Sequence, residues 1–443
     1  MIEILQLIRI ASASRQDKVS LDDRQKAIAI INWQREILKE AISQPGPLQP
    51  SVQALSDYLN CDTGNSIARM YATKMLEESK LEWFVFDNIE QWLRCINYVI
   101  QRAPEYDPDP NKQFFFPMST LFVFFMYTPS GSVLFRLEEF NQCLAAVLQA
   151  WCDYLNSSES RLVLNPTQQI PAQEGWLSPA SQKQFCLEQC INYENRDNPE
   201  MPYWGFLSYN DFFHREINLE AFRPLAGPGD DKVIVSANDG TVYRIARDVE
   251  ACAEFWAKGQ NYSLIDMLDN SPYTQSFIHG DVLQSFLDGS DYHRWHAPIS
   301  GQVLEARIIP GLTFSELLSE GFDLSAGTKS QGYEAMVNTR ALIIIENPAI
   351  GKVAVLPIGI TEISSITIMV QEGQQVQKGA ELGYFSYGGS SLALVFQANI
   401  IQEFTAKEPS NQGNGSTEPC KTAENCKAED GCLRVRAKIA IAK

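Results

Sequence analysis

Histidine is scarce in this chain, and acidic residues outnumber basic ones. The sequence of 443 residues contains 4 histidines, 36 lysines and arginines, and 54 aspartates and glutamates, which gives a formal net charge of −18. Nucleic acids and anionic membrane surfaces attract positively charged proteins, so this balance argues against wholesale electrostatic binding to either. We therefore expect no nucleic-acid partner.

The chain also lacks a long apolar run. The longest, residues 114–127, contains Pro117 and falls short of the roughly 20 residues that a membrane-spanning helix needs. The first ten residues include Glu3 and Arg9 and have no small-residue cleavage site of the kind that ends a signal peptide. The sequence thus predicts a cytoplasmic protein without a transmembrane segment.

Cysteines are spread thinly, with 10 in the whole chain. Because no export signal is visible, we expect them to be reduced. Cys420, Cys426 and Cys432 recur every six residues in a polar tail, but the tail lacks the two-residue gaps and the histidines of common zinc sites. We accordingly expect no metal.

The first 200 residues have helical patterns. Ser20 followed by Asp23 resembles a capping box, and it opens a segment to Ile42 with apolar residues at helical spacing. A second apolar stripe runs over residues 140–155. No histidine precedes His214, so this predicted helical domain, residues 1–200, is a poor candidate for acid–base chemistry.

Short β-branched runs separated by Gly, Pro and Asp dominate the rest of the chain. The predicted strands lie at residues 233–235, 241–245, 281–287, 341–346, 352–356, 363–370 and 391–397. Because no long helical pattern separates them, we expect mainly antiparallel pairing. The sequence thus predicts an α+β protein with a β-rich domain at 201–405 and a polar tail at 406–443, which ends in a strand at 433–442.

A glycine- and serine-rich break interrupts the apolar run 384–396. Gly388, Gly389, Ser390 and Ser391 stand where a strand would continue. One interpretation is a bulge or tight turn, the usual meaning of glycine inside a strand pattern. The other is a strained Gly389–Ser390 peptide bond that the serine hydroxyl attacks.

Three further residues offer chemistry. His293 and His296 lie in the run Asp-Tyr-His-Arg-Trp-His-Ala-Pro at 291–298, where a His-x-x-His pair suits metal binding, acid–base catalysis or a structural role equally. Asp239 precedes a glycine at a predicted turn, either as a plain hairpin residue or as a functional acid. With Ser390 they supply the parts of an Asp-His-Ser relay.

A serine hydrolase does not fit these parts well. Its nucleophile elbow needs Gly-x-Ser-x-Gly on a strand-to-helix turn. Here Leu392 occupies the position of the last glycine, and a predicted strand follows.

The motifs, taken in order, resemble those of the phosphatidylserine decarboxylase family. They are the run Tyr-Asn-Asp-Phe-Phe-His-Arg-Glu at 209–216, Arg-Pro at 223–224, Ser-Ala-Asn-Asp-Gly at 236–240, the histidine run at 291–298, and Gly-Ser at 389–390. Further runs resemble the branch that includes the fungal L-tryptophan decarboxylase of psilocybin biosynthesis. These lie at 101–106, 127–131, 175–179, 355–359 and 384–390.

The resemblance implies a self-cleaving enzyme with a pyruvoyl cofactor derived from Ser390. In the family the equivalent serine attacks the preceding carbonyl, and the products are a β chain, here residues 1–389, and an associated α chain, residues 390–443. His296 would activate Ser390, Asp239 would orient His296, and His293 would protonate the carbon that CO₂ leaves. The pyruvoyl ketone would form a Schiff base with the substrate amine, without pyridoxal phosphate or metal.

Two substrates and one non-enzymatic alternative remain open. An aromatic L-amino acid is slightly favoured over phosphatidylserine, because the chain shows neither a spanning helix nor a basic face. Residues 297–303 and 370–382 resemble strand-and-turn sequences of lipoyl and biotin carrier domains. In those domains a lysine at a hairpin tip carries the cofactor, and no lysine lies between these two segments in a Met-Lys-Met or Asp-Lys-Ala type sequence. The family's usual Leu-Gly-Ser-Thr is Gly-Gly-Ser-Ser here, so Ser391 is a second candidate for the cleavage site, and the sequence leaves open whether it competes with Ser390.

Overall fold

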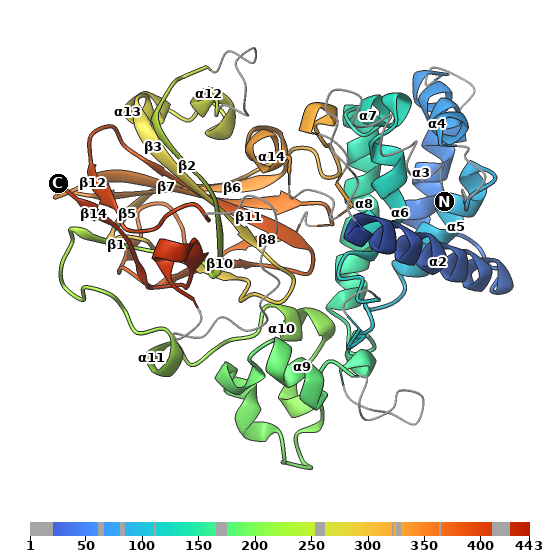
Figure 1. Ribbon diagram of the computed structural model, residues 1–443, viewed down its shortest axis with the longest axis horizontal. Coiled ribbons are helices and arrows are strands. Elements are labelled where there is room, and N and C mark those ends of the chain that lie inside the picture. Colours follow the sequence, from blue (N-terminus) through green and yellow to red (C-terminus); the bar gives the residue numbers. More distant parts are fainter. Residues whose placement is uncertain are drawn as a thin grey trace.

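A computed structural model describes residues 21–60, 66–79, 85–109, 112–164, 175–252, 262–320, 323–324, 329–362, 365–409 and 426–443. Helices from the first part of the chain lie beside a sheet built from the second part (Figure 1). The longer helices are α2 (Leu21–Ser43), α3 (Pro50–Asn60), α4 (Ser66–Glu78), α5 (Ile89–Val99), α6 (Pro117–Met126), α7 (Pro129–Leu134) and α8 (Glu138–Leu155).

Short helices join the two halves and cover the sheet. They are α9 (Pro179–Gln184), α10 (Tyr209–Phe213), α11 (Leu219–Phe222), α12 (Leu264–Met267), α13 (Thr274–Phe277) and α14 (Gln331–Val337). Single 3₁₀ turns are η1 (Ser160–Val163), η2 (Leu187–Gln189), η3 (Ile191–Asn195), η4 (Pro202–Gly205), η5 (Leu318–Glu320) and η6 (Ala428–Asp430).

Helix α6 is the centre of the helical half. It begins at Pro117, which suits the first turn of a helix, and all of its residues are buried. The Phe122 ring packs against Trp92 at 5.0 Å and against Phe314 at 4.7 Å between ring centroids. Because Phe314 belongs to the second half of the chain, the two halves share one apolar core.

The main sheet contains eight of the described strands, in the order β13-β2-β3-β11-β7-β6-β5-β9, and every pair is antiparallel. Smaller sheets have the orders β4-β10-β8 and β1-β14-β12. The strands are β1 (Val233–Val235), β2 (Gly240–Val249), β3 (Gly280–Leu287), β4 (Arg294–His296), β5 (Gly301–Ile309), β6 (Arg340–Asn347), β7 (Gly351–Ile360), β8 (Ile366–Ile368), β9 (Gln375–Val376), β10 (Glu381–Phe385), β11 (Gly389–Phe396), β12 (Ile401–Phe404), β13 (Cys432–Leu433) and β14 (Lys438–Ala442).

Strand β11 is covered on both faces. Leu392 and Leu394 pack into the core shared with the smaller sheets, whereas Ala393 and Val395 pack into the core under α12, α13 and α14. Side chains that alternate between two apolar layers explain why this run is apolar at nearly every position. The layers are therefore helices, main sheet and small sheets.

The predicted fold class is confirmed, with a helical region followed by an antiparallel β-rich domain. The predicted helices over 20–42 and 140–155 correspond to α2 and α8, although Ser20 lies outside the described residues. The predicted strand at 433–442 is split into β13 and β14, because the chain turns with a positive φ of 69° at Arg436.

The expectation that the cysteines are reduced is wrong for part of the chain. Cys426 and Cys432 form a disulfide with Cα atoms 5.1 Å apart, and Cys186 is also disulfide-bonded. Cys420 lies outside the described residues. The sequence shows the spacing of the cysteines, but only the turn η6 shows that two of them meet.

A group of buried acids lies where the halves meet. Glu316 and Glu334 are 3% and 1% exposed, and both lie near Tyr127 at the end of α6. Burial, reinforced by the charge of Asp323, raises the pKa of Glu316 above its usual range, and burial does the same for Glu334. The folded protein therefore favours the protonated acids.

We predict that this group makes the protein less stable as pH rises. An acid whose pKa is higher in the folded state stabilises the fold fully below its unfolded pKa, and this contribution is lost as pH rises towards the folded pKa. Glu316→Gln should raise the free energy of unfolding by at least about 1.4 kcal/mol at about pH 8, and by less at about pH 5. Thermal unfolding at both pH values measures this, with Glu320→Gln, an exposed carboxylate, as control. An equal effect of Glu316→Gln at both pH values would contradict the prediction.

Candidate active site

Ser390 lies at the start of the central strand, fully buried. It is opposite Leu287 of β3 and Gly359 of β7, and its side chain is 0% exposed. Its Oγ has no hydrogen-bond partner among the residues that the structure describes. Leaving a buried hydroxyl unsatisfied costs free energy, so such groups in native proteins call for an explanation, of which reactivity is one.

Ser391 differs from its neighbour in this respect. Its side chain points to the opposite face of β11 and is also 0% exposed. Its Oγ accepts a hydrogen bond from Gln284 Nε2 at 2.9 Å, and it lies 2.8 Å from Ser285 O and 3.0 Å from Gln331 Oε1, both of which accept. The hydroxyl of Ser391 is thus saturated and held in place.

The segment before Gly389 is fixed by the helical half. Tyr387 N donates to Asn210 Oδ1 at 3.0 Å, and the Tyr387 hydroxyl donates to the main-chain oxygen of Phe115. Its ring lies edge-on to Trp151 of α8 at 5.4 Å. Gly388 then takes a φ of 147°, which residues with a side chain rarely adopt.

The strand on the other side is also tied to the helices. Ile360, the last residue of β7, is paired with Gly389. Two residues later the Glu362 carboxylate accepts hydrogen bonds from Ser119 N at 2.8 Å and Ser119 Oγ at 3.0 Å, in the first turn of α6. Burial raises the pKa of Glu362, while these bonds to the helix N-terminus stabilise its ionised form. Two helices thus brace the backbone around Gly389–Ser390.

His293 lies beside the segment that leads to Ser390. Its buried ring stacks on Phe213 of α10 with centroids 3.9 Å apart. Phe213 also contacts the Tyr387 ring at 5.2 Å, and His293 O accepts a hydrogen bond from Phe385 N at 3.0 Å. The fold therefore brings His293 close to the predicted cleavage site.

His296 is held as a neutral ring. Its Nδ1 lies 3.0 Å from Gly379 O, a carbonyl that can only accept, so Nδ1 carries the hydrogen. Burial lowers the pKa of His296 to about 4, although the bond to Gly379 and the charge of Asp239 act in the opposite direction. Nε2 is then free of hydrogen and accepts from the Tyr292 hydroxyl at 3.1 Å. This is the protonation state that a general base requires.

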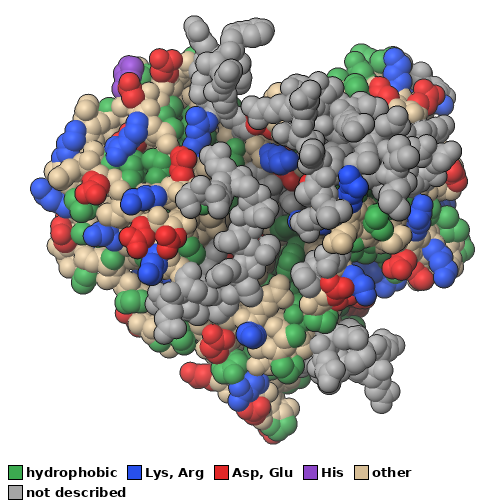
Figure 2. All heavy atoms as spheres, viewed as in Figure 1, with side chains coloured by type: hydrophobic (Ala, Val, Ile, Leu, Met, Phe, Trp, Pro, Cys, Tyr) green, Lys and Arg blue, Asp and Glu red, His purple; other side chains and the backbone are tan. Residues whose placement is uncertain are grey.

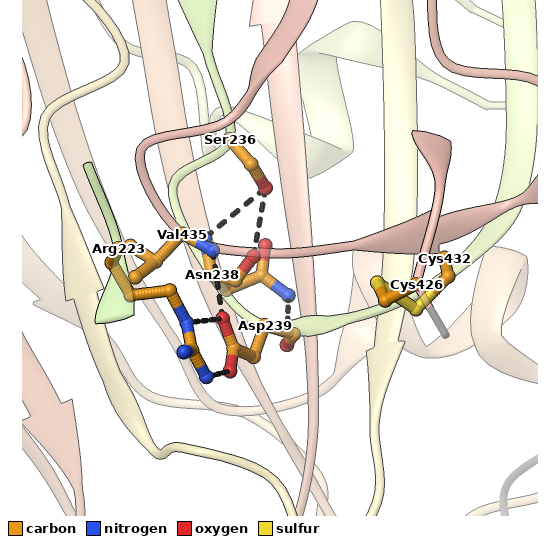
Figure 3. Close-up of a disulfide and its surroundings, with 7 residues drawn as sticks. All are labelled: Arg223, Ser236, Asn238, Asp239, Cys426, Cys432 and Val435. Carbon is orange, nitrogen blue, oxygen red and sulfur yellow. Dashed lines mark hydrogen bonds and ion pairs between the residues drawn. A yellow bond between two sulfur atoms is a disulfide. The ribbon is translucent and has the colours of Figure 1, made fainter. Parts of the chain in front are cut away.

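Asp239 lies at the turn into β2 and is 2% exposed. Arg223 donates to both carboxylate oxygens, at 3.1 and 2.5 Å, and Val435 N donates to Oδ1 at 2.7 Å (Figure 3). The next residue, Gly240, begins the strand that pairs with β3, which in turn pairs with β11. Asp239 therefore lies about two strand spacings, roughly 10 Å, from β11, the strand that contains Ser390.

The four predicted residues thus occupy one end of the sheet, but their contacts were not foreseen. His296 N donates to Ala237 O at 2.7 Å, which ties β4 to the turn that carries Asp239. The ring of His296, however, bonds to Tyr292 and Gly379, and the carboxylate of Asp239 to Arg223. Sequence reasoning gave no role to Tyr292, Arg223, Phe213 or Asn210, although each belongs to one of the runs that carry the family resemblance.

In the described ranges no group of three or more His, Cys, Asp or Glu side chains is placed to hold a metal ion. None of the helices described there has the length and apolar character needed to cross a membrane.

Comparisons with known proteins cover most of the chain. Residues 209–417 match the family model described as phosphatidylserine decarboxylase, and residues 49–185 match a second model of the same description. The decarboxylase iboD of Amanita muscaria is 35% identical over 64% of this chain and 85% of its own length. The L-tryptophan decarboxylase of Psilocybe cubensis is 32% identical over 72% of this chain and 76% of its own.

Relatives named for phosphatidylserine match between 46% and 64% of this chain. The phosphatidylserine decarboxylase proenzyme 3 of Schizosaccharomyces pombe is 31% identical over 46% of this chain and 20% of its own length. The family motifs, the β-rich domain that carries them and the extent of these matches lead to one conclusion. The chain belongs to the phosphatidylserine decarboxylase family and is a decarboxylase, a carboxy-lyase.

Proposed function

We propose that this decarboxylase cleaves its own Gly389–Ser390 bond and then removes the carboxylate of a free aromatic L-amino acid. The observation that carries the first part is the buried hydroxyl of Ser390, which has no partner in the described part of the chain. The adjacent carbonyl of Gly389 lies in backbone that two helices brace. A nucleophile without competing hydrogen bonds, beside a fixed carbonyl, is suited to attack it.

The surrounding residues divide the work of cleavage. Ser390 Oγ attacks the Gly389 carbonyl, and the peptide bond becomes an ester. His296, neutral and with its Nε2 free of hydrogen, is the base that takes up the proton of the hydroxyl, with the Tyr292 hydroxyl in contact with that nitrogen. Asp239, ionised against Arg223, supplies the negative charge that stabilises a protonated His296.

β-Elimination then breaks the ester, which releases the carboxylate of Gly389 and leaves a dehydroalanine at residue 390. Its imine tautomer takes up one water and loses ammonia, which leaves a pyruvoyl group in place of an added cofactor. Its ketone supplies an electron sink for the electron pair that remains on the substrate carbon when CO₂ departs. The chain's own contribution to decarboxylation is His293, whose ring Phe213 holds beside the cleavage segment. We assign to His293 the delivery of a proton to the reacting carbon.

The extent of the matches supports a free amino acid as substrate. The L-tryptophan decarboxylases of Psilocybe cubensis and Psilocybe cyanescens match 72% and 82% of this chain, whereas the relatives named for phosphatidylserine match 46% to 64%. On the face drawn in Figure 2, basic and acidic side chains are interspersed over the sheet half, and neither forms a broad patch. Phosphatidylserine remains the second candidate, because both family models carry its name.

Ser390 and Ser391 should differ completely as cleavage residues. Ser390→Ala should leave one intact chain, because the nucleophile is gone. Ser391→Ala should still yield two fragments with the cut after Gly389, because the Ser391 hydroxyl serves as a hydrogen-bond anchor. Gel electrophoresis and the mass of the larger fragment check both variants. An intact Ser391→Ala chain, or a cut that moves by one residue, would show that Ser390 is not the nucleophile.

The two histidines should separate cleavage from decarboxylation. His296→Ala and Asp239→Asn should slow cleavage by about 100-fold or more, the usual contribution of a positioned base. His293→Ala should be cleaved normally and lose CO₂ release. His279→Ala, an exposed histidine paired with Asp248, is the matched control and should retain both activities. Normal cleavage in both His296→Ala and Asp239→Asn would refute the proposed base.

A direct assay should identify the substrate. We expect CO₂ release from tryptophan, and to some degree from tyrosine or phenylalanine, and none from phosphatidylserine in mixed vesicles. Equal amounts of cleaved enzyme are assayed on all four, with uncleaved Ser390→Ala as the blank. Release from phosphatidylserine alone would establish the second candidate instead.

A further inference from the structure

The last described segment of the chain, residues 426–443, lies beyond the match to the family model, which ends at residue 417. We propose that residues 431–437 position Asp239 for self-cleavage and that the Cys426–Cys432 disulfide holds them there, so that reduction of this disulfide slows cleavage. This proposal rests on the role given to Asp239 above, and it adds a redox-sensitive element to that role.

The segment binds the Asp239 turn from both sides. Val435 N donates to Asp239 Oδ1 at 2.7 Å, and Val435 is 1% exposed. On the strand before the turn, Ser236 N donates to Ala437 O at 2.8 Å and Arg436 N donates to Ser236 O at 3.0 Å. On the strand after it, Val242 N donates to Gly431 O at 2.7 Å. The turn that carries Asp239 is therefore enclosed by backbone from the C-terminal segment.

The contact with the carboxylate complements that of Arg223. Arg223 contacts both oxygens, so the charge of Asp239 is balanced from one side (Figure 3). The Val435 amide approaches Oδ1 as a second donor, which fixes the rotation of the carboxylate as well as its charge. A carboxylate held by two separate donors presents a defined charge to the buried His296.

The disulfide lies at the N-terminal end of this segment. Cys432 is paired with Thr241 in β13, a strand of two residues at the edge of the main sheet. Such a short edge pairing contributes little stability by itself. The bond to Cys426 closes a loop around η6 and limits the positions that Cys432 can occupy. Because the undocked segment then has fewer conformations, β13 and the residues after it lose less chain entropy when they bind the Asp239 turn.

Reduction would release this restraint. A dithiol such as dithiothreitol supplies two electrons and two protons: the bond between the Cys426 and Cys432 sulfurs breaks, each sulfur becomes a thiol, and the reductant becomes a cyclic disulfide. Cys432 is partly exposed and so can be reached. Without the cross-link, the Val435 amide spends less time on Asp239, and Arg223 alone orients the carboxylate.

Full-length chain made by cell-free synthesis tests the proposal. The appearance of the two fragments is followed in oxidised glutathione and in dithiothreitol. We expect cleavage to be about tenfold slower in dithiothreitol, roughly the effect of weakening one hydrogen bond to a charged group. Removal of the reductant and reoxidation of the uncut chain should restore the faster rate. Equal rates in the two conditions would overturn the proposal.

Matched cysteine variants identify the disulfide responsible. The double variant Cys426→Ser and Cys432→Ser should be slow in both conditions and insensitive to dithiothreitol. Cys252→Ser, at an exposed free cysteine, should behave as wild type. Because Cys186 is disulfide-bonded too, Cys186→Ser must keep the response to dithiothreitol; loss of the response in that variant would assign the effect to Cys186 and overturn the proposal.

Two readouts separate positioning from general loss of structure. The uncut Ser390→Ala chain should lose some thermal stability in dithiothreitol but stay folded at the assay temperature, and enzyme cleaved before reduction should keep its decarboxylation rate. Unfolding of that chain at the assay temperature, together with loss of decarboxylation, would show a structural role and contradict the proposal. Failure of Asp239→Asn to slow cleavage would refute the role of Asp239 itself. Slow cleavage of Asp239→Asn, combined with equal rates of the wild-type chain in the two conditions, would refute only the redox element.

Discussion

The pairing of β11 between β3 and β7 is the constraint on which the site depends. It places Ser390 in the middle of an eight-stranded sheet, where the residue is fully buried and opposite Leu287 and Gly359. Bulk water does not reach a hydroxyl in that position, and the fold supplies no partner for it in the described residues. The adjacent Ser391, on the other face, receives three contacts. One strand thus presents a saturated serine and an unsatisfied one, and only the second is suited to chemistry.

The helical half contributes rigidity rather than acid–base groups. Tyr387 is bound by Asn210 and Phe115, and Glu362 is bound by Ser119, on the two strands that flank Gly389. The Phe213 ring links the same region to His293. A backbone fixed on both sides loses little further entropy when Ser390 approaches the carbonyl. This gives a physical reason for a second domain without a catalytic histidine.

Much of the fold could be predicted because it follows from local patterns. The apolar stripe at 140–155 and the β-branched runs at 281–287 and 391–397 each encode their own element, and α8, β3 and β11 match them. The pairs that build the site are not local: Asp239 meets Arg223 at a separation of 16 residues and Val435 at 196. Motifs marked the four candidate residues, but nothing in the spacing indicates that residues 431–437 contact the Asp239 turn or that Cys426 bonds to Cys432.

The central claim is that Ser390 becomes the N-terminal pyruvoyl group of a new chain. Its most direct test is the intact mass of the smaller fragment of the purified protein. We expect a peptide of residues 390–443 that is lighter by one ammonia than the same peptide beginning with serine, and that resists N-terminal sequencing. A single uncut chain, or a fragment that begins with an ordinary serine, would contradict it.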